Sequence, residues 1–116
     1  IPIGVRGGSD ESNLSSYLIA DTQEENYLSL DAGTLYAGIK FYLNRIQSTE
    51  EPSAFLQQKV KGYYISHPHF DHSSGLIINS PEDISGKKIY GPQVTIEAFK
   101  NHVFVWDSLI NLFIRR

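Results

Sequence analysis

The sequence predicts an α/β fold, and three observations lead to this class. Short apolar runs of strand length alternate with stretches in which apolar residues recur at helical spacing. The chain contains no internal repeat and no low-complexity tract. Its 116 residues, of which 41% are hydrophobic, have the length and composition of one small domain with a core. We therefore expect one α/β unit over residues 1–116.

The first part of the chain is expected to form a β-hairpin followed by a helix. Residues 17–20 and 27–30 are short apolar runs separated by the polar stretch DTQEEN, which is typical of two strands joined by a turn. The second run ends in the turn signature DAGT at positions 31–34. Apolar residues then recur at positions 35, 36, 39, 42, 43 and 46, so residues 35–46 are predicted to be helical.

The middle of the chain is expected to contain a loop, a short helix and a buried strand. Residues 47–53, QSTEEPS, are polar and include a proline, which indicates a loop. Ser53 is a candidate cap for a short helix that runs through Val60. The apolar run GYYIS at positions 62–66 predicts a buried strand that leads directly into His67.

The last part of the chain continues the alternation of helix and strand. Residues 73–78 are predicted to begin a helix, and residues 79–87 form a polar loop with a proline and a glycine. Residues 88–90 predict a short strand closed by a Gly-Pro turn, and residues 94–104 predict an amphipathic helix. The chain begins without an initiator methionine and its last residues, FIRR, carry no stop signal, so we expect a fragment of a longer product.

Composition excludes several classes of protein and of site. Charged residues make up 20% of the chain and the formal net charge is -3, so the basic surplus that usually accompanies nucleic-acid binding is missing. No apolar run approaches the roughly 20 residues that cross a bilayer, and the N-terminus lacks the order of a signal peptide. Cysteine is absent, so any metal ion must be held by imidazole and carboxylate groups.

Four residues in the stretch HPHFDH are candidate metal ligands: His67, His69, Asp71 and His72. In this composition, chance places three histidines and an aspartate in that pattern with a probability on the order of a few in 10,000. The alternative, a surface turn with coincidental histidines, is disfavoured because the cluster follows a buried strand and precedes a glycine-containing turn. The mixed set of imidazole and carboxylate suits Zn²⁺ or Mn²⁺ better than Ca²⁺ or Mg²⁺, and zinc is the first choice.

The HPHFDH stretch resembles the HxHxDH signature of the metallo-β-lactamase superfamily. Its surroundings resemble the class II cyclic-nucleotide phosphodiesterases, the low-affinity fungal enzymes among them. The segments that carry this closer resemblance are GG at 7–8, NLSS at 13–16, LDAGT at 30–34, ISH at 65–67, SGL at 74–76, IYG at 89–91, and TIE and NHVF within 95–104.

The resemblance implies a fold, a metal site and a reaction. The fold would be an αββα sandwich with two zinc ions at the sheet edge, Mn²⁺ being the alternative metal. One ion would be held by His67 and His69, and the other by Asp71 and His72, with Asp71 also a catalytic residue. The reaction would be metal-dependent hydrolysis of 3′,5′-cyclic nucleotides, cyclic AMP and also cyclic GMP, to 5′-monophosphates. A small-molecule substrate, no nucleic-acid or membrane partner and a cytoplasmic location are the matching expectations, and the oligomeric state stays open.

For several residues near the cluster, two structural roles are considered. Asp31 matches the strand-end aspartate that orients the metal-binding loop in this superfamily, and an ordinary Asx-turn is the alternative. Ordinary turn and strand-start roles are favoured over a place on the rim of the site for Gly7, Gly8, Asn13 and Ser15.

The remaining histidine and several aromatic residues are expected to be structural. His102 lies on the last predicted helix and is expected to pack or hydrogen-bond rather than bind metal. Packing in the core or against the sheet, rather than stacking on a nucleobase, is expected for Tyr63, Tyr64, Tyr90 and Trp106.

The chain departs from the family in one respect. The family also needs a further histidine, a bridging aspartate and a final histidine, and none has a counterpart after His72. We therefore expect residues 1–116 to be the N-terminal part of a catalytic domain, inactive alone and with a large apolar face exposed. Two alternatives remain: another hydrolase of the superfamily, such as an RNA-processing nuclease, thioesterase or sulfatase, and a non-catalytic scaffold domain.

Overall fold

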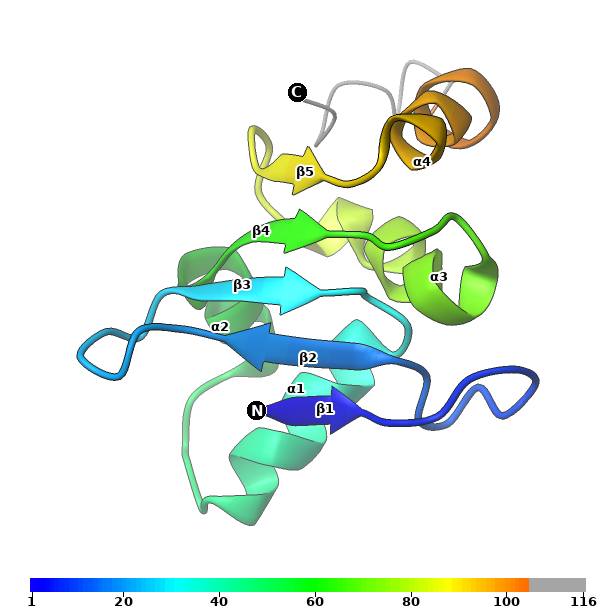
Figure 1. Ribbon diagram of the computed structural model, residues 1–116. Coiled ribbons are helices and arrows are strands. Elements are labelled where there is room, and N and C mark those ends of the chain that lie inside the picture. Colours follow the sequence, from blue (N-terminus) through cyan, green and yellow to red (C-terminus); the bar gives the residue numbers. More distant parts are fainter. Residues whose placement is uncertain (105–116) are drawn as a thin grey trace.

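The computed structural model describes residues 1–104, which form a mixed sheet of five strands (Figure 1). The strands lie side by side in chain order: β1 (Pro2–Gly4), β2 (Ser16–Ile19), β3 (Tyr27–Leu30), β4 (Val60–Tyr64) and β5 (Lys88–Tyr90). The pairs β1–β2 and β2–β3 are antiparallel, whereas β3–β4 and β4–β5 are parallel. Parallel neighbours require a crossover, and the connections β3–β4 and β4–β5 both contain helices.

The described helices lie in the two crossovers and after β5. They are α1 (Leu35–Arg45), α2 (Pro52–Lys59), α3 (Phe70–Ile78), the 3₁₀ turn η1 (Ser80–Glu82), α4 (Gln93–Ala98) and the π-helical turn η2 (Phe99–Val103). The first three lie behind the sheet in Figure 1. Leu18, Tyr63 and Ile89 point from three strands into this layer and are each only 1% exposed, so the core lies between the sheet and the helices. None of the helices within residues 1–104 has the length and hydropathy needed to cross a membrane.

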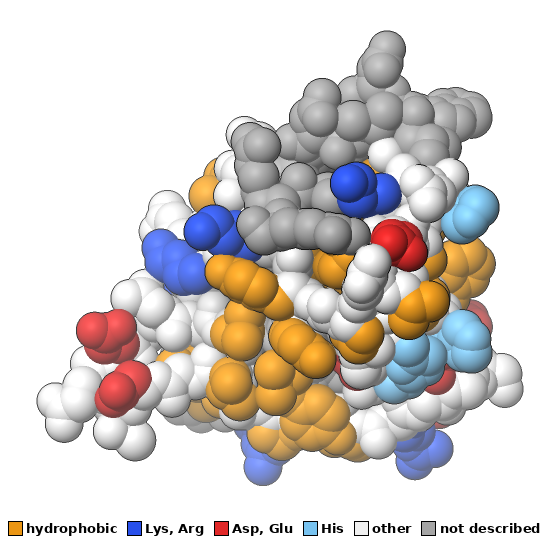
Figure 2. Space-filling model, turned by 45° about the horizontal axis from the view of Figure 1, so that its top comes forward, with side chains coloured by type: hydrophobic (Ala, Val, Ile, Leu, Met, Phe, Trp, Pro, Cys, Tyr) orange, Lys and Arg blue, Asp and Glu red, His pale blue; other side chains and the backbone are white. Residues whose placement is uncertain are grey.

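The other side of the sheet is an open apolar face. Alternation along the strands directs Tyr17, Ile19, Tyr64 and Tyr90 to this side, where they are between 39% and 48% exposed. Hydrophobic side chains gather on the side of the molecule turned toward the viewer in Figure 2. One sheet covered by helices on one face is half of an αββα arrangement, and the exposed apolar face expected from the sequence is present.

Most of the predicted elements are confirmed. The hairpin is β2–β3, the long helix is α1, the strand at 88–90 is β5, and the last helix is α4 continued by the π-helical turn. Strand β1 was not predicted, because three residues that include a proline and a glycine carry no strand pattern of their own. It is held by pairing with β2, including the hydrogen bond that the Leu18 amide donates to the Ile1 carbonyl.

The largest differences from the predicted boundaries are in three elements. Helix α2 begins at Pro52, with Glu51 at the N-cap position and no side-chain cap, so the role given to Ser53 is wrong; proline is preorganised for the first helical position. Strand β4 begins at Val60 and ends at Tyr64, earlier than predicted. Helix α3 begins at Phe70, three residues before the predicted start, and η1 lies within the predicted loop.

Candidate metal centre

The HPHFDH segment lies at the carboxyl end of β4, where the chain leaves the sheet and enters α3. His67 and His69 are in the connecting loop, and His69 occupies the N-cap position of α3 with an extended backbone. Because α3 begins at Phe70, Asp71 and His72 belong to its first turn. A carboxylate is favoured there by the helix dipole, so the earlier start of α3 gives Asp71 a defined place beside the loop histidines.

The structure brings the four predicted ligands together. One ligand atom from each of His67, His69 and Asp71 lies within 4.8 Å of those of the other two. The ring of His72 is next to them, with its centroid 3.9 Å from that of His67 and its Nε2 3.4 Å from Asp71 Oδ2. Imidazole nitrogens and a carboxylate oxygen at such spacing are a donor set that fits a divalent transition-metal ion.

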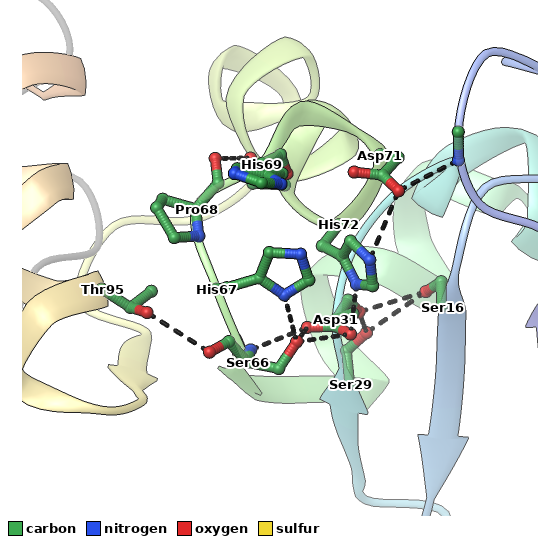
Figure 3. A network of polar contacts seen from close by, with 12 residues as sticks. Ser16, Ser29, Asp31, Ser66, His67, Pro68, His69, Asp71, His72 and Thr95 are labelled. Carbon is green, nitrogen blue, oxygen red and sulfur yellow. Dashed lines mark hydrogen bonds and ion pairs between the residues drawn. The ribbon is translucent and has the colours of Figure 1, made fainter.

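Asp31 supports this group from below (Figure 3). Its Oδ1 accepts hydrogen bonds from the Ser66 amide at 2.8 Å and the Ser66 hydroxyl at 2.9 Å. Its Oδ2 lies 2.7 Å from Nδ1 of His72. These partners are 35 and 41 positions away along the chain, whereas an Asx-turn is made two residues on, so the positioning role is favoured over the Asx-turn.

The backbone around Asp31 is itself held by hydrogen bonds. Asp31 adopts a left-handed conformation with φ of 57°, which aspartate tolerates better than most residues. Its amide donates to the Tyr64 carbonyl, and its carbonyl accepts from the hydroxyls of Ser16 at 3.3 Å and Ser29 at 2.7 Å. Both serines are fully buried. Two inward-facing strand positions therefore carry hydroxyls rather than apolar groups because they fix the Asp31 turn.

Counting protons in this network assigns the tautomers of two histidines. An ionised carboxylate can only accept, so Nδ1 of His72 carries the proton that points at Asp31. The single hydroxyl proton of Ser66 is donated to Asp31, and therefore Ser66 Oγ accepts from Nδ1 of His67, which is 3.1 Å away. In the neutral form of each ring this leaves the lone pair on Nε2, and that is the tautomer that binds a metal ion through Nε2.

Two glycines allow α3 to pack closely against the turn at residues 31–34. The Ala32 amide donates to the His72 carbonyl at 2.7 Å, and the Gly75 amide donates to the Ala32 carbonyl at 2.8 Å. A Cβ atom on Gly75 would lie 2.5 Å from the Gly33 carbonyl oxygen, and one on Gly33 would lie 2.5 Å from the Asp71 carbonyl oxygen. Both positions therefore require glycine, and the close approach brings His72 within reach of Asp31.

Asp71 receives a hydrogen bond from the N-terminal segment. The Gly8 amide donates to Asp71 Oδ2 at 3.0 Å, and this bond, together with the nearby His72 and His67 rings, holds the pKa of Asp71 below its usual value. Gly8 is in the turn conformation expected for it, with φ of 77°. The turn role was favoured over a place on the rim of the site, and the contact shows that Gly8 has both; its partner could not be named because the two residues are 63 positions apart.

The other residues weighed beside Gly8 have backbone roles. The Asn13 carbonyl accepts from the Arg6 amide, and the Ser15 carbonyl accepts from the Gly33 amide, both at 2.8 Å. These are the turn and strand-start roles expected of Asn13 and Ser15. A Cβ atom on Gly7 would come within 3.2 Å of Asp71 Oδ2, so Gly7 borders the carboxylate closely.

Comparison with known families decides the membership of the chain. Residues 1–114 match the model of the class II cAMP phosphodiesterases. The chain belongs to this family. The resemblance drawn from HPHFDH and its flanking segments is thereby confirmed, and with it the placement in the metallo-β-lactamase superfamily.

Relatives of the family come from bacteria and from eukaryotes. The chain is 40% identical over 116 residues to a probable 3′,5′-cyclic-nucleotide phosphodiesterase of Yersinia pestis, with 91% of this chain and 34% of that protein covered. It is 33% identical over 128 residues to the 3′,5′-cyclic-nucleotide phosphodiesterase of Aliivibrio fischeri, with 96% and 36% covered. The chain thus spans about a third of the length of these relatives.

Two solved structures share the fold. The crystal structure of unliganded yeast PDE1 matches with a TM-score of 0.80 at 20% identity, covering 98% of this chain and 48% of that one. Human tRNase Z, short form, matches with a TM-score of 0.53 at 20% identity, covering 97% and 42%. The described sheet and helices therefore correspond to about half of the yeast structure.

The residues that were expected to be structural lie in different places in this member of the class II family. His102 is exposed on the π-helical turn and is not part of the described group of ligand atoms. Tyr63 is in the core, as expected. Of the two places expected for Tyr64 and Tyr90, the core is wrong: both lie half-exposed on the open face of the sheet, because strand alternation directs them away from the helices. Trp106 lies outside the described residues.

Proposed function

We propose that this chain is the N-terminal part of a metal-dependent phosphodiesterase that hydrolyses 3′,5′-cyclic nucleotides to 5′-monophosphates. Membership in the class II family and the cyclic-nucleotide activity named for its relatives support the substrate class. The observation that carries the chemistry is the convergence of His67, His69 and Asp71 above the Asp31 network. Cyclic AMP is the proposed substrate, with cyclic GMP as a second one.

The proposed metal is zinc, with two ions in the complete site and Mn²⁺ as the alternative. His67 and His69 would hold one ion, and Asp71 and His72 would hold the other. Such ions supply Lewis acidity, which activates water at neutral pH and neutralises the charge of a phosphodiester. The remaining ligands and the nucleobase pocket would come from chain beyond these residues.

The part of this chain in the reaction is to present ligands in a fixed geometry. Asp31 orients His72 directly and His67 through Ser66, so two imidazoles enter the site in the tautomer that binds metal. Asp71 places a negative charge beside them, and the hydrogen bond from Gly8 keeps that charge in one orientation. Preorganised ligands lower the cost of ordering the site when metal and substrate arrive.

The proposal is tested with the full-length protein. We expect the zinc-loaded enzyme to convert cyclic AMP to AMP, and to lose this activity with a chelator or with His69→Ala. The control is His102→Ala, which removes an exposed histidine outside the cluster and should leave turnover unchanged. Absence of turnover of both cyclic AMP and cyclic GMP by protein that contains its full metal complement would refute the proposal.

A second candidate is a different hydrolase of the same superfamily, since human tRNase Z shares the fold. The fold alone does not fix the substrate. A panel of cyclic nucleotides, structured RNA, thioesters and sulfate esters separates the candidates. A scaffold role without catalysis is disfavoured by the intact cluster, and it predicts a purified full-length protein with no bound metal by elemental analysis.

A further inference from the structure

The loop between β1 and β2, residues 5–15, lies against the first turn of α3. Its conformation is fixed by contacts of its own: the Arg6 amide donates to the Asn13 carbonyl at 2.8 Å, and the Ser12 amide and hydroxyl both bond to Asp10 Oδ1. Gly8 is in the turn of this loop, and its amide points at Asp71 Oδ2. A local structure far from the cluster in sequence thus presents one donor to a candidate ligand.

Gly8 has a conformational reason to be glycine and no steric one. Its φ of 77° lies in the left-handed region, which residues with a Cβ rarely adopt. A Cβ atom at this position would meet no heavy atom within 4 Å. A side chain would therefore act on the site only by shifting the backbone, and hence the amide, away from Asp71.

A carboxylate that accepts this hydrogen bond can still bind a cation. Each carboxylate oxygen has two lone-pair directions, so the amide uses one of about four. The bond restrains the Asp71 side chain next to His72 Nε2, 3.4 Å away. Ligands restrained in this way lose less conformational entropy when a metal ion binds.

We propose that Gly8 is a positioning residue of the metal centre, and that metal binding at Asp71 and the conformation of loop 5–15 are thermodynamically linked. This inference rests on the metal site of the proposed function. Linkage is reciprocal: if the Gly8 amide favours metal binding, bound metal stabilises the loop by the same free energy. Loop 5–15 then becomes ordered when metal binds at the site.

The test measures zinc affinity of the full-length protein by competition with a chromophoric chelator. Outer-sphere partners of ligands contribute about 10- to 100-fold to metal affinity, so we expect Gly8→Ala to weaken zinc binding about tenfold. The zinc affinity of Gly8→Asn should be within about threefold of that of the wild type, because asparagine tolerates the left-handed region. Hydrogen exchange of the Gly8 amide should slow when zinc is added to the wild type.

Gly86→Ala is the matched control. Gly86 also has a left-handed φ, of 87°, and an added Cβ would also meet nothing within 4 Å, but it precedes β5 in another part of the fold. We expect Gly86→Ala and Gly8→Ala to lower the stability of the protein to a similar extent, because both place a Cβ on a left-handed backbone. Gly86→Ala should leave the zinc affinity unchanged. Equal zinc affinities for wild type, Gly8→Ala and Gly86→Ala would overturn the inference, and so would a loss in Gly8→Asn as large as in Gly8→Ala. Failure of the wild type to bind zinc would instead overturn the proposed function.

Discussion

Two polar networks in this protein are each organised around an aspartate, and they serve different purposes. Asp31 bonds to Ser66 and His72 at the edge of the sheet, with its side chain 14% exposed. Asp83 bonds to Tyr63 at 2.5 Å and to Lys87 at 2.6 Å under the sheet, with its side chain 1% exposed. One network lies at the surface beside the candidate ligands, and the other is sealed in the interior.

The difference lies in where each network ends. The Asp83 network ends on a cation: Lys87 Nζ neutralises the carboxylate and donates a further hydrogen bond to the Leu56 carbonyl. The Asp31 network ends on two imidazole rings, which use Nδ1 to bond to Ser66 and Asp31 and keep Nε2 outside the network. The same acid therefore closes a structural network when its partner is a lysine, and prepares a binding site when its partners are histidines.

The largest effect is expected when the buried network is broken. Asp83→Ala removes the only acidic partner of Lys87 found in the described salt bridges and leaves a buried cation, which costs about 3–5 kcal/mol of stability. The measurement is the urea midpoint of unfolding. Asp83→Ala combined with Lys87→Met should recover much of the loss, since no buried charge then remains. A single variant as stable as the exposed-site control Asp21→Ala would contradict this account.

A smaller and different effect is expected when the surface network is broken. Asp31→Asn keeps the shape and the tolerance for the left-handed backbone, and it removes the charge that fixes His72. We expect zinc affinity of the full-length protein to fall about 10- to 100-fold with little change in the urea midpoint. Asp83→Asn serves as the comparison, and it should change the midpoint much more than the affinity. Loss of stability without loss of affinity in Asp31→Asn would remove the distinction between the two networks.

The smallest effect concerns the dependence of stability on alkaline pH. Burial, and then the charge of Asp83, raise the pKa of Tyr63 well above its usual value. A raised pKa in the folded state means that its stabilising contribution is complete below pH 10 and is lost as pH rises through the folded-state pKa. The free energy of unfolding should therefore fall more steeply above pH 10 in the wild type than in Tyr63→Phe, by up to about 1.4 kcal/mol per pH unit. The difference between the two curves isolates Tyr63 from Lys87, and identical slopes would contradict the prediction.

The sequence was sufficient where the signal is local. The α/β class, the hairpin and the long helix follow from apolar spacing, and the ligand cluster is contiguous, so its members are found without knowledge of the fold. The start of α3 was missed because His69 is not a residue that caps helices and makes no cap bond, while Pro68 suggested a loop. The ligand roles of the four clustered residues remain predictions.

The residues that hold the candidate ligands in place could not be predicted from the sequence. Asp31 acts on His67 through Ser66, and Ser16 and Ser29 act on the Asp31 backbone, so their roles depend on the strand pairing that brings them together. Gly8 reaches Asp71 only because the loop between β1 and β2 folds over α3. A serine at a buried strand position is the one sequence signal of such a network. It indicates that the hydroxyl has a hydrogen-bond partner, but not which residue that partner is.

The most direct test of the metal centre is anomalous X-ray scattering at the zinc edge from crystals of the zinc-loaded full-length protein. The account predicts anomalous peaks about 2.0–2.1 Å from Nε2 of both His67 and His72, with the Nδ1 atoms still bonded to Ser66 and Asp31. It also predicts a carboxylate oxygen of Asp71 at about 2.0–2.2 Å from zinc. Zinc bound through Nδ1 of either histidine, or no anomalous peak within reach of HPHFDH, would contradict it.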